Sequence, residues 1–164
     1  MPVKVVEQEH QYDGVVFDVI KLTLEHDDGT RFKRNLVSKS ECVVVLTYHK
    51  DKEKFLLTKE FRVGSMSESF GFVAGMIDKG ETPESAAERE LQEETGYGIP
   101  SRGSKLMYLG NCFSSSGFTD ERVHYYYAEV SGSPFPQQLD HDEKIELVEV
   151  TKNGLLNFVH IEPN

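Results

Sequence analysis

The sequence predicts a single domain of the mixed α/β class, with a sheet as its main element and few helices. Its 164 residues are enough for one sizeable core and too few for two comfortable domains. Apolar, β-branched runs bounded by turn residues recur along the chain, whereas only one helix is strongly signalled before the C-terminal segment. We find no internal repeat, low-complexity tract or long linker, so a single domain over residues 1–164 is expected.

Strands are predicted wherever a short apolar run lies between turn residues. The turn segments HDDGT (26–30) and HKDKEK (49–54) should fold the first four of these runs into two hairpins. The segment 131–143 contains two prolines and many polar residues, so we expect a long exposed loop there. The expected strands lie near residues 15–25, 31–36, 42–48, 54–61, 105–113, 122–130 and 145–150.

The clearest helix signal spans residues 83 to 95. Thr82 can cap its N-terminus, and Pro83 suits the first helical position. Gly96 is placed to end the helix in the left-handed conformation. A shorter helix over 153–159 is predicted because its apolar residues recur at the spacing of one buried face.

Composition excludes several function classes. With 18 Lys and Arg against 28 Asp and Glu, the formal net charge is −10, which argues against nucleic acid as a partner. No apolar run approaches the roughly 20 residues of a membrane span, and the N-terminal residues do not resemble a secretory signal. A cytoplasmic protein without a membrane partner is expected. Cys42 and Cys112 lie among apolar residues and are predicted to be reduced core residues.

Three glutamates crowd one face of the predicted helix. At 100° per residue, Glu90, Glu93 and Glu94 fall within an arc of roughly 100°. Like charges so placed repel one another, and a solvated glutamate-rich face is the common outcome for such a string. Hard divalent cations such as Mg²⁺ prefer carboxylate oxygens, however, and would remove the repulsion. The cluster is therefore a candidate metal site.

The residues around this cluster resemble the Nudix box. The spacing of that motif is found in Gly75, Glu81 and the segment Arg89–Tyr97, which reads RELQEETGY. The resemblance implies a Nudix fold, an α/β/α sandwich with an N-terminal β-hairpin region, which holds Mg²⁺ or Mn²⁺. By position, the metal ligands would be Glu90, Glu93, Glu94 and the carbonyl of Ala74. Glu93 and Arg89 would be catalytic, with Arg89 fixing Glu93 at i+4.

Residues flanking the box resemble the ADP-ribose pyrophosphatase branch of this family over roughly residues 30–150. Arg62 closes the tripeptide Glu60-Phe61-Arg62 and is the predicted phosphate contact, because a guanidinium can bind two phosphate oxygens. The loop SSSGFTDE (114–121) resembles the branch's substrate loop, which implies substrate contacts by Gly117, Phe118 and Glu121. Two departures, Ser116 and Val73, stand where the branch usually has proline.

The resemblance also suggests the reaction. We expect Mg²⁺-dependent hydrolysis of ADP-ribose to AMP and ribose 5-phosphate, with Glu143 as the base that activates water and Glu121 as the runner-up. Another nucleoside diphosphate sugar, a dinucleotide or a nucleoside triphosphate remains an alternative substrate, and a nucleotide-binding module without turnover is a second alternative. A homodimer that pairs through N-terminal strands, at about residues 1–40, is implied as well.

Overall fold

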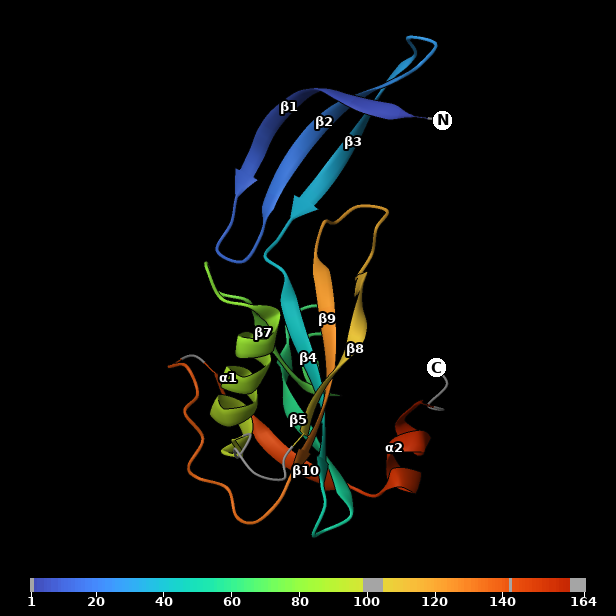
Figure 1. Cartoon of the computed structure of the whole chain (residues 1–164). Coiled ribbons are helices and arrows are strands. Elements are labelled where there is room, and N and C mark those ends of the chain that lie inside the picture. Colours follow the sequence, from blue (N-terminus) through green and yellow to red (C-terminus); the bar gives the residue numbers. More distant parts are fainter. Residues whose placement is uncertain (1, 99–104, 142, 160–164) are drawn as a thin grey trace. The chain divides into compact units, whose positions relative to one another are not determined.

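The computed structural model describes residues 2–98, 105–141 and 143–159 (Figure 1). The chain divides into two compact units, which are described separately below. The first holds residues 1–42 and 111–123, and the second holds residues 43–110 and 124–164.

The first unit is built on a three-stranded antiparallel sheet in the order β1-β2-β3. Its strands are β1 (Val3–Asp13), β2 (Asp18–His26) and β3 (Arg31–Ser38). The Asp-Gly turn predicted the β2–β3 hairpin correctly, and Gly29 there has a φ of 82°. The strand β1 was not predicted, because all its residues are exposed and no buried face imposes an apolar alternation. The segment 111–123 joins this unit through a parallel bridge between Val37 and Thr119.

The larger sheet has the order β10-β5-β4-β9-β8, with β6 paired to β5 and β7 paired to β4. The five predicted strands in this part of the chain are confirmed to within one residue at each end. The strands β6 and β7 were missed because both are short, with five and four residues, and β6 is rich in Ser and Gly. The bounds are β4 (Cys42–His49), β5 (Lys54–Arg62), β6 (Ser67–Gly71), β7 (Val73–Met76), β8 (Lys105–Phe113), β9 (Arg122–Val130) and β10 (Glu146–Val150).

Both predicted helices are present, as α1 (Pro83–Thr95) and α2 (Lys152–Val159). Figure 1 shows them on opposite sides of the larger sheet, which gives the layered mixed α/β arrangement that was predicted. Neither of these helices is long and apolar enough to cross a membrane. One face of α1 enters the core with Ala86, Ala87 and Leu91, all at 0% exposure, so the helix is fixed rigidly against the sheet.

The prediction that both cysteines are core residues is wrong. Cys42, the first residue of β4, is only half-buried. Cys112 is exposed because it lies on β8, the last strand of its sheet, which leaves many side chains in solvent. The two cysteines form no disulfide. The pKa of the Cys42 thiol rises to about 11, chiefly through burial, and the charge of Glu121 contributes to that rise.

Candidate functional site

The candidate site lies where β7 turns into α1. Thr82 caps the helix as predicted: the Ser85 backbone N–H donates a hydrogen bond to Thr82 Oγ1 at 3.1 Å. At the other end, Gly96 is left-handed with a φ of 73°, and its N–H donates to the Gln92 carbonyl at 2.8 Å. Local cap chemistry therefore fixes both ends of the helix that carries the glutamates.

Arg89 is the organising residue of the site. Its Nε and Nη2 donate to the two Glu81 carboxylate oxygens at 3.1 and 2.9 Å, and Nη2 also donates to the Met76 carbonyl at 2.9 Å. Its Nη1 donates to Glu90 Oε1 at 2.7 Å and to Glu93 Oε2 at 3.0 Å. One guanidinium thus ties the turn before the helix to two of the three clustered glutamates. The predicted i+4 contact with Glu93 is confirmed, whereas the contact with Glu90 was not foreseen.

Hydrogen bonding by Arg89 lowers the pKa of the Glu81 carboxyl, so Glu81 is the anionic anchor of this arrangement. Conversely, the pKa of Arg89 is raised well above its usual value by its bonds to Glu81, Glu90 and Glu93. A bidentate arginine–carboxylate pair has a fixed geometry, which a lysine would not reproduce. Glu81 and Arg89 therefore position the other carboxylates.

Glu94 is the most deeply buried carboxylate of the cluster, with 3% of its surface exposed. Its Oε2 has no hydrogen-bond partner among the described residues. Burial is the main reason that its pKa rises to about 9, and the charges of Glu90 and Glu60 add to the rise, while a backbone hydrogen bond from Ala74 opposes it. A buried carboxylate oxygen without a donor is costly unless a proton or a cation occupies it.

Glu90 lies next to Glu94 and is also largely buried, with 13% of its side chain exposed. Burial raises the pKa of Glu90, and the charges of Glu93 and Glu143 raise it as well, whereas the hydrogen bond and charge of Arg89 lower it. Glycine is required opposite this carboxylate: a Cβ on Gly75 would lie 1.9 Å from Glu90 Oε1. The absence of a side chain at Gly75 therefore lets the backbone of β7 lie directly against Glu90.

The donor set fits a hard divalent cation, since it combines carboxylates, the backbone around Ala74 and a buried oxygen without a partner. In the part of the chain that the structure describes, no three His, Cys, Asp or Glu side chains converge in a ready-made metal geometry. Arg89 holds Glu90 and Glu93 in this arrangement, so a cation would compete with its guanidinium for their oxygens.

The predicted base, Glu143, lies in the loop before β10 and is exposed. Its carboxylate accepts a hydrogen bond from the Asp140 backbone N–H at 3.2 Å. The charge of Glu143 nevertheless raises the pKa of both Glu90 and Glu94, so it acts on the cluster electrostatically.

The loop that carries Glu143 is tied to the end of α1. The Gln138 backbone N–H donates to the Glu93 carbonyl at 2.9 Å, and Gln137 Nε2 donates to the Glu94 carbonyl. Sequence patterns gave no hint of these two anchors, because they join residues more than forty positions apart.

Arg62, the predicted phosphate contact, ends β5 with half of its side chain exposed, and it forms an ion pair with Glu60. Glu60 was not predicted as a functional residue. Its charge acts on Glu94 although the two lie on different elements, β5 and α1.

The predicted substrate residues Gly117, Phe118 and Glu121 belong to the first unit. Gly117 is open to solvent, and the Phe118 ring is exposed while its carbonyl accepts a hydrogen bond from the Val37 N–H at 2.7 Å. Burial raises the pKa of Glu121, but hydrogen bonds from Lys39, at 2.6 Å, and from Ser114 lower it overall. Glu121 is therefore already neutralised by a lysine, which disfavours it as the base relative to Glu143.

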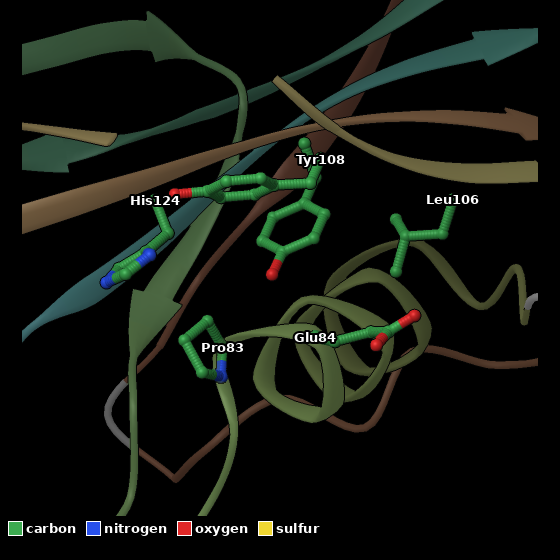
Figure 2. A pocket seen from close by; sticks show the side chains of 6 residues that line it. Pro83, Glu84, Leu106, Tyr108 and His124 are labelled. Carbon is green, nitrogen blue, oxygen red and sulfur yellow. The ribbon is translucent and has the colours of Figure 1, made fainter. Parts of the chain in front are cut away.

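A separate pocket of about 390 Å³ lies beside the start of α1 (Figure 2). Half of its six lining residues carry aromatic rings. The Tyr108 ring lies 5.2 Å from that of Tyr126 and 6.2 Å from that of His124. Glu84, also in the lining, is about 120° around the helix from Glu90. The pocket therefore does not include the carboxylate face. Its lining residues are Pro83, Glu84, Leu106, Tyr108, His124 and Tyr126.

Comparison with known proteins shows the family to which the chain belongs. The family model described as NUDIX domain matches residues 39–162, most of the chain. The chain belongs to the Nudix family. The match includes α1 and the carboxylate cluster, so the Nudix resemblance seen in the sequence is confirmed.

Relatives with curated names agree with this membership. The chain is 36% identical to an ADP-ribose pyrophosphatase of Bacillus subtilis over 157 residues, which cover 95% of this chain and 82% of that protein. It is 30% identical to a GDP-mannose pyrophosphatase of Citrobacter koseri over 146 residues, covering 84% of this chain and 74% of that protein. A solved ADP compounds hydrolase has a TM-score of 0.77 at 23% identity, over 97% of this chain and 83% of that one. At that identity the match shows the Nudix fold alone.

Proposed function

We propose that this Nudix protein is a hydrolase that cleaves ADP-ribose to AMP and ribose 5-phosphate with the help of a divalent cation. The observation that carries the proposal is the buried Glu94 oxygen without a partner, placed beside carboxylates that Arg89 organises on the Nudix helix. The similarity to the Bacillus subtilis ADP-ribose pyrophosphatase, over nearly the whole chain, supports the choice of substrate.

Glu90, Glu93, Glu94 and the Ala74 carbonyl would hold the cation, which we propose to be Mg²⁺, with Mn²⁺ as a substitute. The chemistry that such an ion supplies is a lowered pKa of a bound water and neutralisation of pyrophosphate charge. It also explains how a chain with a net charge of −10 accepts an anionic substrate.

The protein's own residues have distinct proposed roles. Glu143 takes the proton from the attacking water, a role that suits an exposed carboxylate whose charge reaches the cluster. Arg89 and Glu81 hold the carboxylates in place. Arg62 contacts a phosphate, and Gly117, Phe118 and Glu121 contact the substrate, as the resemblance to the ADP-ribose branch implies.

We also propose that residues 1–164 act as one Nudix hydrolase and that the chain forms a homodimer through β1. This strand is an edge of its sheet, and every one of its 11 residues is exposed, including Val3, Val5 and Tyr12 at 45 to 56%. A long exposed edge strand is a template for pairing with a second chain. Light scattering of the wild type beside Val5→Lys would test this, since a dimer through β1 should dissociate in the variant.

A cytoplasmic location is proposed as well, in keeping with the lack of a disulfide between Cys42 and Cys112.

A substrate panel tests the function. The protein is incubated with Mg²⁺ and, in separate reactions, ADP-ribose, GDP-mannose, a dinucleotide and a nucleoside triphosphate, and the products are separated by chromatography. We expect ADP-ribose to be hydrolysed fastest. Faster turnover of another compound would keep the Nudix reaction and replace the substrate. Binding without turnover of any compound would instead indicate a nucleotide-sensing module.

GDP-mannose has a specific reason to be in the panel, because the Citrobacter koseri relative is named for it. A nucleoside diphosphate sugar other than ADP-ribose is therefore the second candidate substrate. Both compounds present the same diphosphate to the carboxylate cluster, so the cluster does not discriminate between them.

A further inference from the structure

The loop between β9 and β10, residues 131–145, carries Glu143 and runs alongside α1 (Figure 1). Two prolines flank Phe135 near the start of this loop, and their fixed φ angles restrict the backbone there. The Phe135 N–H donates a hydrogen bond to the Gly96 carbonyl at 2.9 Å. A Cβ on Gly96 would lie 1.9 Å from the Phe135 carbonyl oxygen, so the loop lies directly on the C-terminal end of the helix.

The next two residues of the loop bind the last turn of α1. The final carbonyls of an α-helix have no partner within the helix, and here the loop supplies donors to two of them. The Gln138 backbone N–H donates to the Glu93 carbonyl at 2.9 Å, and the side-chain Nε2 of Gln137 donates to the Glu94 carbonyl. Both carbonyls belong to glutamates of the carboxylate cluster. The loop is therefore fastened to the same turn that carries the cluster.

The Gln137 amide also reaches the far end of the loop. Its Nε2 donates to the Ile145 carbonyl at 3.4 Å. An amide nitrogen has two hydrogens, so one side chain can serve both carbonyls. Ile145 is buried and directly precedes β10. Gln137 thus joins the end of α1 to a point two residues beyond Glu143, and closing the loop in this way leaves fewer conformations to the Glu143 backbone.

Between these anchors, the chain turns at Glu143. The Glu143 N–H donates to the Asp140 carbonyl at 3.0 Å, and the Asp140 N–H donates to the Glu143 carboxylate at 3.2 Å. These two bonds lie within the turn and do not attach it to another element. The place of the Glu143 carboxylate therefore depends on the contacts that fasten the two ends of the loop.

We propose that Gln137 is a positioning residue that holds Glu143 in place relative to the carboxylate cluster. Its side-chain amide fastens the loop to the backbone of α1 at one end and to the start of β10 at the other. The Glu143 carboxylate then meets the attacking water in one orientation. The inference rests on the proposed function, because it concerns the step in which Glu143 takes a proton. Gln137 itself touches no reacting atom.

Gln137→Met tests the fastening, because methionine keeps the length of the side chain and lacks the N–H donors. Gln138→Met is the matched control, since the bond at that position comes from a backbone N–H that the substitution keeps. In the metal-free protein, the amide hydrogens of Gln138 and Glu143 should exchange about tenfold faster in Gln137→Met, measured by NMR, and at the wild-type rate in Gln138→Met. Exchange at the wild-type rate in Gln137→Met would overturn the proposal.

Turnover gives a second readout. Gln137→Met should lower kcat for ADP-ribose about tenfold, with KM and Mn²⁺ affinity unchanged, because only the placement of the base is lost. The same substitution in a Glu143→Gln background should cause no further loss, since the amide acts through the Glu143 carboxylate. A merely structural amide would lower kcat by the same factor in both backgrounds, and that result would reject the positioning role.

The positioning role and the proposed function fail in different ways. If another compound of the substrate panel is hydrolysed fastest, the same comparison is made with that compound, and only the choice of substrate is lost. If Glu143→Gln keeps the wild-type kcat, Glu143 is not the base and the role of Gln137 is rejected, while cation-dependent hydrolysis stands. If no compound is hydrolysed, the proposed function fails, and hydrogen exchange alone decides whether Gln137 fastens the loop.

Discussion

Burial of Glu94 should make the metal-free protein lose stability as the pH rises, and Glu94→Gln should remove that loss. The pKa of this carboxyl rises from 4.5 to about 9 in the folded protein, chiefly through burial. Between those pH values the folded protein keeps a proton that the unfolded chain has released. The stability contributed by this group is therefore complete below pH 4.5 and is lost progressively as the pH rises toward 9.

The magnitude follows from one proton, which changes the unfolding free energy by about 1.4 kcal/mol for each pH unit in that window. Between pH 5 and pH 7 the unfolding free energy of the wild type should fall by about 3 kcal/mol more than that of Glu94→Gln. For a chain of this size, the difference in Tm between the two proteins should change by roughly 5–10 °C over the same range. Glutamine keeps an acceptor for the Ala74 hydrogen bond and carries no charge, so the variant lacks this pH dependence.

Thermal and urea unfolding in EDTA, at pH 5, 6, 7 and 8, measures the effect. Glu88→Gln is the control, because Glu88 is exposed on the same helix and makes the same change of charge. The difference between wild type and Glu94→Gln should grow with pH, while that between wild type and Glu88→Gln should stay flat. Parallel stability curves for wild type and Glu94→Gln would refute the claim that Glu94 is buried in this way.

Three further predictions concern β7, the helix cap and the helix that carries the site. Gly75→Ala should lower cation affinity and activity at least tenfold with little change in Tm, because the new Cβ displaces only the end of the Glu90 side chain. A fully active variant would contradict the close approach of Gly75 to Glu90. Thr82→Ala should lose about 1 kcal/mol, or 2–4 °C in Tm, with kcat unchanged, and an unaltered Tm would mean that the cap is dispensable. Arg89→Gln should reduce kcat by about 10- to 100-fold, because Glu81, Glu90 and Glu93 lose their common partner. A variant with the wild-type kcat would show that Arg89 does not position these carboxylates.

Local chemistry explains why α1 was predictable. Thr82, Pro83 and Gly96 determine its ends through the conformations of single residues, and the structure has the cap contacts that they imply. The strand β1 has no comparable signal, because its hydrogen bonds to β2 require no buried side chain. Its pairing depends on a partner strand that follows a separate turn, which a pattern within β1 does not reveal.

The candidate site was predictable only as far as one helix reaches. Helical geometry placed Glu90, Glu93 and Glu94 on one face, but it did not show that Arg89 also holds the Met76 carbonyl in the preceding turn. Glu60 was missed because it lies on β5, outside the helix, and its charge acts on Glu94 only through the three-dimensional fold.

In the proposed function, the carboxylate cluster of Glu90, Glu93 and Glu94 supports cation-dependent cleavage of ADP-ribose. The most direct measurement is AMP release from ADP-ribose with excess Mg²⁺, for wild type, Glu94→Gln and Glu88→Gln side by side. We expect AMP from the wild type and from Glu88→Gln, and a loss of activity of at least 100-fold in Glu94→Gln. AMP release by Glu94→Gln at the wild-type rate would contradict it.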